Sequence, residues 1–214
     1  MYNEERNYMP RIIVPLLNNE IYHVFNRGID KRDVYIDKSD TLRFYQSLNF
    51  FNTVEPTINF DSAKVQIKLH SVQNKLVNIK AYALLPNHFH LIIEQIDEGG
   101  ISEFMKRVLG GYTSYFNKKY ERTGALFQGT FKRVHVNSDK QFNYLFAYVN
   151  ENHFVHNFAF KREICHTSSL HYQGLAKSSL ITDVDRAYNF LDSVALAEQI
   201  YKRRSTDKIT NLIE

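Results

Sequence analysis

Hydrophobic and polar positions along the chain predict four β-strands. Residues 21–27 are mainly apolar, aromatic or β-branched and stop at Gly28, and residues 130–136 alternate between the two classes. Between them, residues 77–95 form a long, mainly apolar run with a turn signal at Pro86-Asn87. Because proline and asparagine favour turns, this signal predicts two neighbouring strands, 77–85 and 87–95.

Four helices are predicted from apolar residues spaced three and four apart. The first follows capping residues at 37–40, and the third, from residue 140 to about 153, follows capping residues at 137–139. Ser102 is the predicted cap of the second helix, which continues through Gly110-Gly111 to Phe116 and stops before Thr123-Gly124. A fourth helix is predicted at residues 183–201.

These elements follow one another as strand, helix, strand, strand, helix, strand and helix. The first six give the β-α-β-β-α-β pattern of the ferredoxin-like sandwich, an α+β fold with an antiparallel sheet. We expect one domain over residues 21–157, in which the third helix is an addition. Residues 1–20 form a lead-in, and residues 158–214 form a C-terminal extension of loop and helix packed on the same domain. For residues 53–75 the sequence is compatible with either an extra hairpin or a loop.

Composition narrows the class of protein. Of 214 residues, 43% are hydrophobic and 14% aromatic, which is typical of a globular chain. No apolar run approaches the ~20 residues that cross a bilayer, and the charged opening segment lacks the apolar stretch of a secretory signal. Cys165 is the single cysteine, so an internal disulfide is excluded. We therefore expect a cytoplasmic protein without a membrane partner.

Positive charge gathers among aromatic residues in the second half of the predicted domain. A net charge of +4 by itself favours a polyanionic partner only weakly. Interleaved cations and rings suit single-stranded nucleic acid, because cations contact phosphates and rings stack on bases. A solvated helix end with buried rings explains the same pattern equally well. The cations concerned are Lys118, Lys119, Arg122, Lys132 and Arg133.

Two histidines lie two residues apart in the third predicted strand. Alternate side chains of a strand share a face, so His88 and His90 project side by side. Neutral imidazoles at a fixed separation suit a divalent metal ion. Two polar residues on a solvated face are the alternative. Because the flanking residues are strongly apolar, the strand is expected to be central, where buried histidines need partners.

The third helix carries a second set of polar residues at a regular spacing. Tyr144, Tyr148 and Asn152 are four residues apart and so share one face of the predicted helix. A tyrosine on a helix face is most often a core residue, but an amide beside it can supply an oxygen to a metal ion. If this helix crosses the sheet, Asn152 joins His88 and His90 around one cation.

Four ordered segments, together with the first strand, resemble the single-tyrosine HUH transposases, in particular those associated with repetitive extragenic palindromes. The resemblance covers about residues 20 to 172. The matching segments are Tyr22-His23-Val24-Phe25-Asn26-Arg27-Gly28, Tyr82 to Leu91, Tyr115-Phe116-Asn117 with Arg122 to Lys132, Tyr148-Val149-Asn150-Glu151-Asn152, and His166-Thr167-Ser168-Ser169.

The resemblance implies a ferredoxin-like enzyme that cleaves and rejoins single-stranded, hairpin-bearing DNA through a 5′-phosphotyrosine. It implies His88, His90 and Asn152 as ligands of Mg²⁺ or Mn²⁺, and Tyr148 as the nucleophile. We add Arg27, at the end of the first strand, to the cations expected to contact DNA. A homodimer is left open.

Reach along the helix also favours Tyr148. It is one turn, ~5.4 Å, from the level of Asn152, whereas Tyr144 is two turns, ~11 Å, away. A hydroxyl that attacks a metal-held phosphate must approach to ~3–3.5 Å.

Two other functions compete with strand transfer. The first is a domesticated, catalytically inactive protein that still binds specific sequences or hairpins. The second is an RNA-binding ferredoxin-like module, which would display aromatic residues on the open face of its middle strands. The face of the third strand that carries His88 and His90 has no aromatic residue, because Phe89 points the other way. This disfavours the RNA-binding module.

Overall fold

A five-stranded antiparallel sheet forms the centre of the computed structural model, which describes residues 15–55, 60, 74–152, 164–175, 178–181, 195–196, 198–199 and 202. The strand order is β4-β1-β3-β2-β5, and every neighbouring pair is antiparallel. The strands are β1 (Ile21–Arg27), β2 (Val77–Leu85), β3 (His88–Gln95), β4 (Lys132–Val136) and β5 (His166–Thr167). The predicted α+β class with an antiparallel sheet is confirmed, and β5 extends the sheet beside β2.

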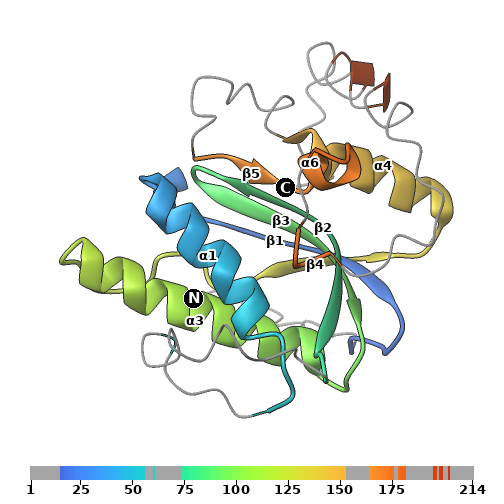
Figure 1. The fold of residues 1–214 in the computed structure, drawn as a ribbon. Helices are drawn as coiled ribbons and strands as arrows, with labels where there is room; N and C mark the ends of the chain where they lie inside the picture. Colours follow the sequence, from blue (N-terminus) through green and yellow to red (C-terminus); the bar gives the residue numbers. More distant parts are fainter. Residues whose placement is uncertain are drawn as a thin grey trace, which may run out of the picture.

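Helices cover both faces of this sheet (Figure 1). On one face lie α1 (Lys38–Phe50) and α3 (Gly100–Lys119), which pack against each other. On the other lie α4 (Asp139–Asn150) and the short α6 (Ser169–Tyr172). A 3-10 turn, η1 (Ile29–Lys31), follows β1. The third predicted helix is thus an addition that forms a second helical layer.

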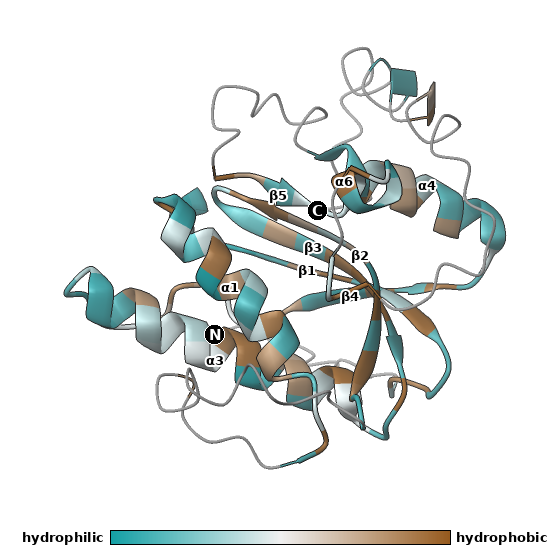
Figure 2. Cartoon of the chain, in the orientation of Figure 1, coloured by the Kyte–Doolittle hydropathy of each residue, from teal (hydrophilic) through white to brown (hydrophobic). Residues whose placement is uncertain are grey.

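The sheet separates two hydrophobic clusters. The larger lies under α1 and α3 and includes Phe44, Phe89 and Leu91, and the smaller lies under α4 and includes Ala83, Ile92 and Phe146. Successive side chains of β3 point to opposite faces of the sheet. Phe89 and Leu91 belong to the larger cluster, and Ile92 belongs to the smaller one, on the face that carries His90. Figure 2 shows both hydrophobic (brown) and hydrophilic (teal) residues along α1 and α3.

Helix starts confirm two predicted caps and correct a third. Asp37 and Asp40 form a reciprocal capping box at α1, and the Ser138 hydroxyl accepts from Gln141 N at α4. Ser102 is not the cap of α3, because that helix already begins at Gly100, after Gly99. Gly99 has a left-handed φ of 68°, and a Cβ on Gly100 would lie 2.4 Å from the Leu76 carbonyl oxygen.

The continuation of α3 through its two glycines is confirmed, whereas the end of α4 differs from the prediction. α3 runs without interruption through Gly110-Gly111, where a Cβ on Gly111 would come within 2.9 Å of the Phe51 ring, so glycine allows α1 and α3 to approach. α4 ends at Asn150 rather than near residue 153, with Glu151 as its C-cap.

Some predictions fall outside the described residues. These are most of the segment 53–75, most of the helix at 183–201 and most of the lead-in. Within the described residues, no helix is long and apolar enough to span a membrane.

Candidate active site

His88 and His90 lie in the middle of the sheet on the face toward α4. Across β1–β3, His88 pairs with Arg27 and His90 pairs with Phe25, and paired residues share a face. Both histidines are buried, and their rings meet edge to face with centroids 5.0 Å apart. The predicted central position and shared face of the two histidines are confirmed.

His23 is a third histidine at this site, which the sequence analysis assigned only to the first strand. Its Nε2 lies 2.9 Å from His90 Nδ1, and both side chains are buried. Burial lowers the pKa of His23 to about 4, so the ring is neutral near pH 7. The alternation of His23 and Phe25 in the first strand was a signal, but only the pairing of β1 with β3 brings His23 to His90.

Hydrogen bonding fixes the direction of the His88 ring. Its Nδ1 lies 2.5 Å from Asn87 Oδ1, while Asn87 Nδ2 donates to the Lys31 carbonyl. An amide oxygen can only accept, so Nδ1 of His88 carries the proton. When the ring is neutral, its lone pair is therefore on Nε2, the nitrogen through which His88 would bind a metal ion.

Tyr148 faces the histidine pair from α4. Its ring is perpendicular to that of His90, at 80°, with centroids 5.4 Å apart, and the side chain is fully buried. α4 packs on β2 and β3 through Leu145, Phe146 and Val149, whose side chains belong to the smaller cluster. Tyr144 is only partly buried at the edge of this cluster. The structure therefore brings Tyr148 to His90.

Asn152 lies two residues beyond the end of α4, so the predicted single helix face does not extend to it. Its side chain is fully buried, and among the described residues neither its Oδ1 nor its Nδ2 has a hydrogen-bond partner. A buried unsatisfied amide is costly, and a metal ion on its oxygen removes part of that cost. Within the same residues, no three His, Cys, Asp or Glu side chains gather as a metal site. An unsatisfied amide oxygen of this kind has the chemistry of a cation ligand.

The segment around β5 holds the end of α4 against β2. Ser168 Oγ donates to Asn150 Oδ1 at 2.6 Å and accepts from Tyr82 N at 3.0 Å. Asn150 Nδ2 in turn donates to the Phe146 carbonyl. Next to it, Ser169 Oγ donates to Glu151 Oε1 at 2.8 Å. We call Ser168 and Asn150 the clasp, because they join β2 to the last turn of α4, which carries Tyr148.

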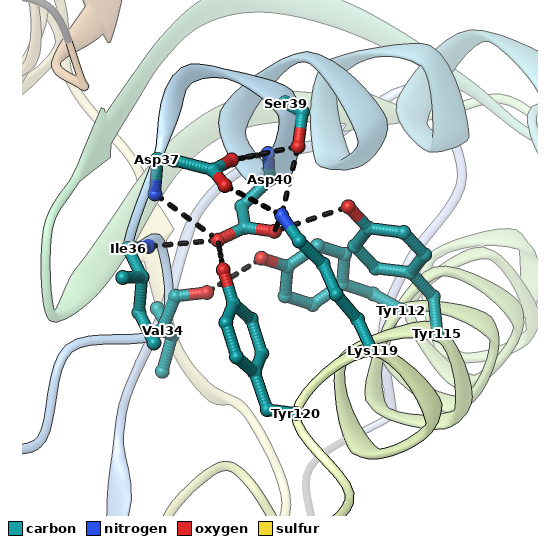
Figure 3. A network of polar contacts seen from close by, with 9 residues as sticks. All are labelled: Val34, Ile36, Asp37, Ser39, Asp40, Tyr112, Tyr115, Lys119 and Tyr120. Atoms are coloured by element: carbon teal, nitrogen blue, oxygen red, sulfur yellow. Dashed lines mark hydrogen bonds and ion pairs between the residues drawn. The ribbon is translucent and has the colours of Figure 1, made fainter.

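The tyrosines of α3 and its C-terminus belong to the α1 and α3 side of the sheet, opposite to the histidine pair. Figure 3 shows their hydroxyls among residues of α1 and the segment before it. Tyr112 donates to the Val34 carbonyl, and Tyr115 and Tyr120 both donate to the buried carboxylate of Asp40. Burial raises the pKa of Tyr112 well above its usual value and that of Tyr120 to about 12. These hydroxyls are engaged away from the histidine pair.

The cations predicted to contact DNA do not share one surface. Lys132 lies on the histidine face, with Nζ 5.7 Å from the Phe25 ring centroid, and Arg27 lies beside His88. Arg133 pairs with Val24 and so points to the other face.

The remaining predicted cations lie around the end of α3. Lys119 binds Asp37 and Asp40, each at 2.7 Å, and Arg122 binds Asn117 and the Ala125 carbonyl. Lys118 is exposed in the last turn of the helix.

Comparison with known proteins finds a transposase family model that matches part of the chain. Residues 60–152 match the family model described as transposase IS200-like. This segment, which is less than half of the chain, is similar to the IS200-like transposases. The matched segment contains the histidine pair, Tyr148 and Asn152, while β1 and α1 precede it.

Comparisons with solved structures and with curated sequences give less similarity. A solved structure of a REP-associated tyrosine transposase bound to a REP hairpin is similar at 16% identity and a TM-score of 0.47, covering 82% of this chain and 93% of that one. No curated protein sequence matches the chain.

The histidine face also bears on the RNA-binding alternative. β3 carries no aromatic residue on this face, but the neighbouring β1 places Phe25 there. However, α4 packs over β2 and β3 on the same face, and Tyr148 contacts His90 there. RNA-binding modules of this fold read bases on an open sheet face, which this chain does not offer on β2 and β3.

Proposed function

We propose that this protein cleaves and rejoins single-stranded DNA through a covalent bond to Tyr148. The observation that carries the proposal is the contact of Tyr148 with His90. It joins the residue that the sequence resemblance implies as the nucleophile to one that it implies as a metal ligand. The buried, unsatisfied amide of Asn152 supports the same site.

His88, His90 and Asn152 would hold a divalent cation such as Mg²⁺ or Mn²⁺, which supplies polarisation of the scissile phosphate and neutralises its developing charge. The histidines would bind it through Nε2, because Nδ1 of His88 faces Asn87 and Nδ1 of His90 faces His23. A tyrosine hydroxyl has an ordinary pKa of ~10, so it attacks slowly unless the phosphate is made more electrophilic.

Tyr148 Oη attacks phosphorus in line with the bond to the 3′ oxygen. The new Oη–P bond forms as the P–O3′ bond breaks, the phenolic proton leaves, and the 3′ oxygen departs as a hydroxyl. The product is a 5′-phosphotyrosine. Attack by a free 3′-hydroxyl reverses these bonds and restores the tyrosine. Because the phosphotyrosine bond conserves the phosphodiester energy, rejoining needs no ATP, and the sequence has no Gly-x-x-x-x-Gly-Lys loop.

The substrate that we propose is single-stranded DNA with a hairpin. The hairpin follows from the sequence resemblance, and the cations Lys132 and Arg27 beside the histidines support a phosphate path across this face. Some of the remaining predicted cations serve folding, as the ion pairs of Lys119 with Asp37 and Asp40 indicate.

The test incubates the full chain with 5′- or 3′-labelled oligonucleotides in Mn²⁺, with and without a hairpin, and separates products on a denaturing gel. A metal-dependent adduct on the fragment with the 5′ phosphate, preferring the hairpin oligonucleotide, is expected. Tight hairpin binding without any adduct would instead identify a catalytically inactive DNA-binding protein.

A further inference from the structure

We propose that His23 is a positioning residue that accepts the Nδ1 proton of His90 and so keeps the His90 lone pair on Nε2. The inference rests on the metal site of the proposed function. It assigns a role to a residue of β1, which lies outside the segment 60–152 that matches the family.

The geometry of the His23–His90 pair is that of a directed hydrogen bond. The two nitrogens are 2.9 Å apart, the ring planes are inclined by 17° and the centroids are 5.1 Å apart. Because the nitrogens are much closer than the centroids, the rings meet edge to edge in nearly one plane. The contact occupies Nδ1 of His90, so this ring would bind a metal ion through Nε2.

The surroundings protect this contact from water. His23 and His90 are 1% and 2% exposed, and the Phe25 ring stacks on both, with centroids 4.9 and 5.6 Å away. Both histidines sit on adjacent strands of the sheet, so their spacing follows from the register of β1 and β3. A hydrogen bond in such a site does not exchange readily with solvent, so the proton position is well defined.

The proton must lie on His90 if Nε2 is to bind a metal. A neutral imidazole carries one proton, and a ligand nitrogen must be the unprotonated one. His23 Nε2 is then the acceptor. The same arrangement already exists at His88, whose Nδ1 donates to Asn87 Oδ1. Both histidines thus have a neighbour on Nδ1, the pattern by which outer partners fix metal-binding imidazoles.

The test measures the tautomer in the metal-free chain and the affinity for Mn²⁺. Two-bond ¹⁵N–¹H spectra of the wild type should show His90 protonated on Nδ1. His23→Leu should disturb this tautomer and weaken Mn²⁺ binding by about 10- to 100-fold in calorimetry, the usual effect of losing an outer partner. His23→Gln, which restores an acceptor oxygen, should recover most of the affinity.

The matched control is His135→Leu, since His135 is a β4 histidine that contacts Glu20 instead of His90. It should leave the His90 tautomer and Mn²⁺ affinity unchanged. A wild-type His90 protonated on Nε2, or wild-type affinity in His23→Leu, would overturn the inference. If His23→Leu does not fold, the wild-type spectrum and His23→Gln still decide. Absence of Mn²⁺ binding by the wild type would contradict the proposed function instead.

Discussion

The rings of Tyr148 and His90 meet at 80° with centroids 5.4 Å apart, although one comes from α4 and the other from β3. This contact predicts that Tyr148→Phe abolishes the covalent DNA adduct. Only the hydroxyl is lost, so Mn²⁺ and DNA binding should remain, and the free energy of unfolding should change by no more than about 1.5 kcal/mol. Tyr144→Phe is the control and should still form the adduct. Mass spectrometry that finds phosphotyrosine at Tyr144, Tyr112 or Tyr115 would refute the assignment.

Removing both histidines should abolish metal-dependent cleavage without unfolding the protein. His88→Ala combined with His90→Ala should abolish adduct formation and calorimetric Mn²⁺ binding. Both side chains are buried, so some loss of stability is expected, and circular dichroism must show that the fold persists. Full cleavage by the folded double variant would exclude these histidines as ligands.

Lys132 and Lys119 should behave differently in DNA binding. Lys132 is exposed on the histidine face, so Lys132→Ala should reduce the slope of log affinity against log salt by about 0.7, the contribution of one single-strand phosphate contact. Lys119 is engaged by Asp37 and Asp40, so Lys119→Ala should lower thermal stability and leave the slope unchanged. An unchanged slope in Lys132→Ala would place the DNA elsewhere.

The clasp predicts a coupling between stability and activity. Ser168→Ala leaves the buried Asn150 Oδ1 without its 2.6 Å donor, so the free energy of unfolding should fall by about 1–3 kcal/mol. Adduct formation should fall as well, because the last turn of α4 loses its attachment to β2. Ser169→Ala is the control, since its partner Glu151 is partly exposed and the loss should be smaller. A double-mutant cycle in which Ser168→Ala and Asn150→Ala add without coupling would contradict the clasp.

Acid stability should depend on Asp37. Hydrogen bonds from Lys119 and Ser39 outweigh desolvation and lower the pKa of Asp37 from 3.8 to about 2. A carboxyl with a lowered folded-state pKa stabilises the fold above its unfolded pKa and loses that contribution as pH falls toward the folded value. Asp37→Asn keeps a capping side chain but removes the charge. In urea unfolding, wild type should exceed Asp37→Asn in stability above about pH 4, and the difference should shrink toward pH 2.

In the background of Lys119→Met, the same comparison should show a smaller difference, because the main partner of the Asp37 carboxylate is gone. A pH-independent difference between wild type and Asp37→Asn would show that the carboxylate stabilises the fold through capping alone.

Local patterns in the sequence were enough for most of the secondary structure. Period-two alternation, capping residues and the Pro86-Asn87 turn predicted the strands, the starts of α1 and α4, and the shared face of His88 and His90. These features depend on residues close together in the chain, whose side-chain directions follow from strand and helix geometry. Where a boundary depended on a distant contact, as at Gly100 against Leu76, the prediction was wrong.

Tertiary structure alone decided which distant residues meet. Pairing of β1 with β3 brings His23 to His90, and packing of α4 on the sheet brings Tyr148 to the same ring. The neighbouring cations Lys132 and Arg133 are separated onto opposite faces, because adjacent strand residues point in opposite directions and one of those faces holds the histidines. Such relationships are set by strand order and register, which no short segment of sequence encodes.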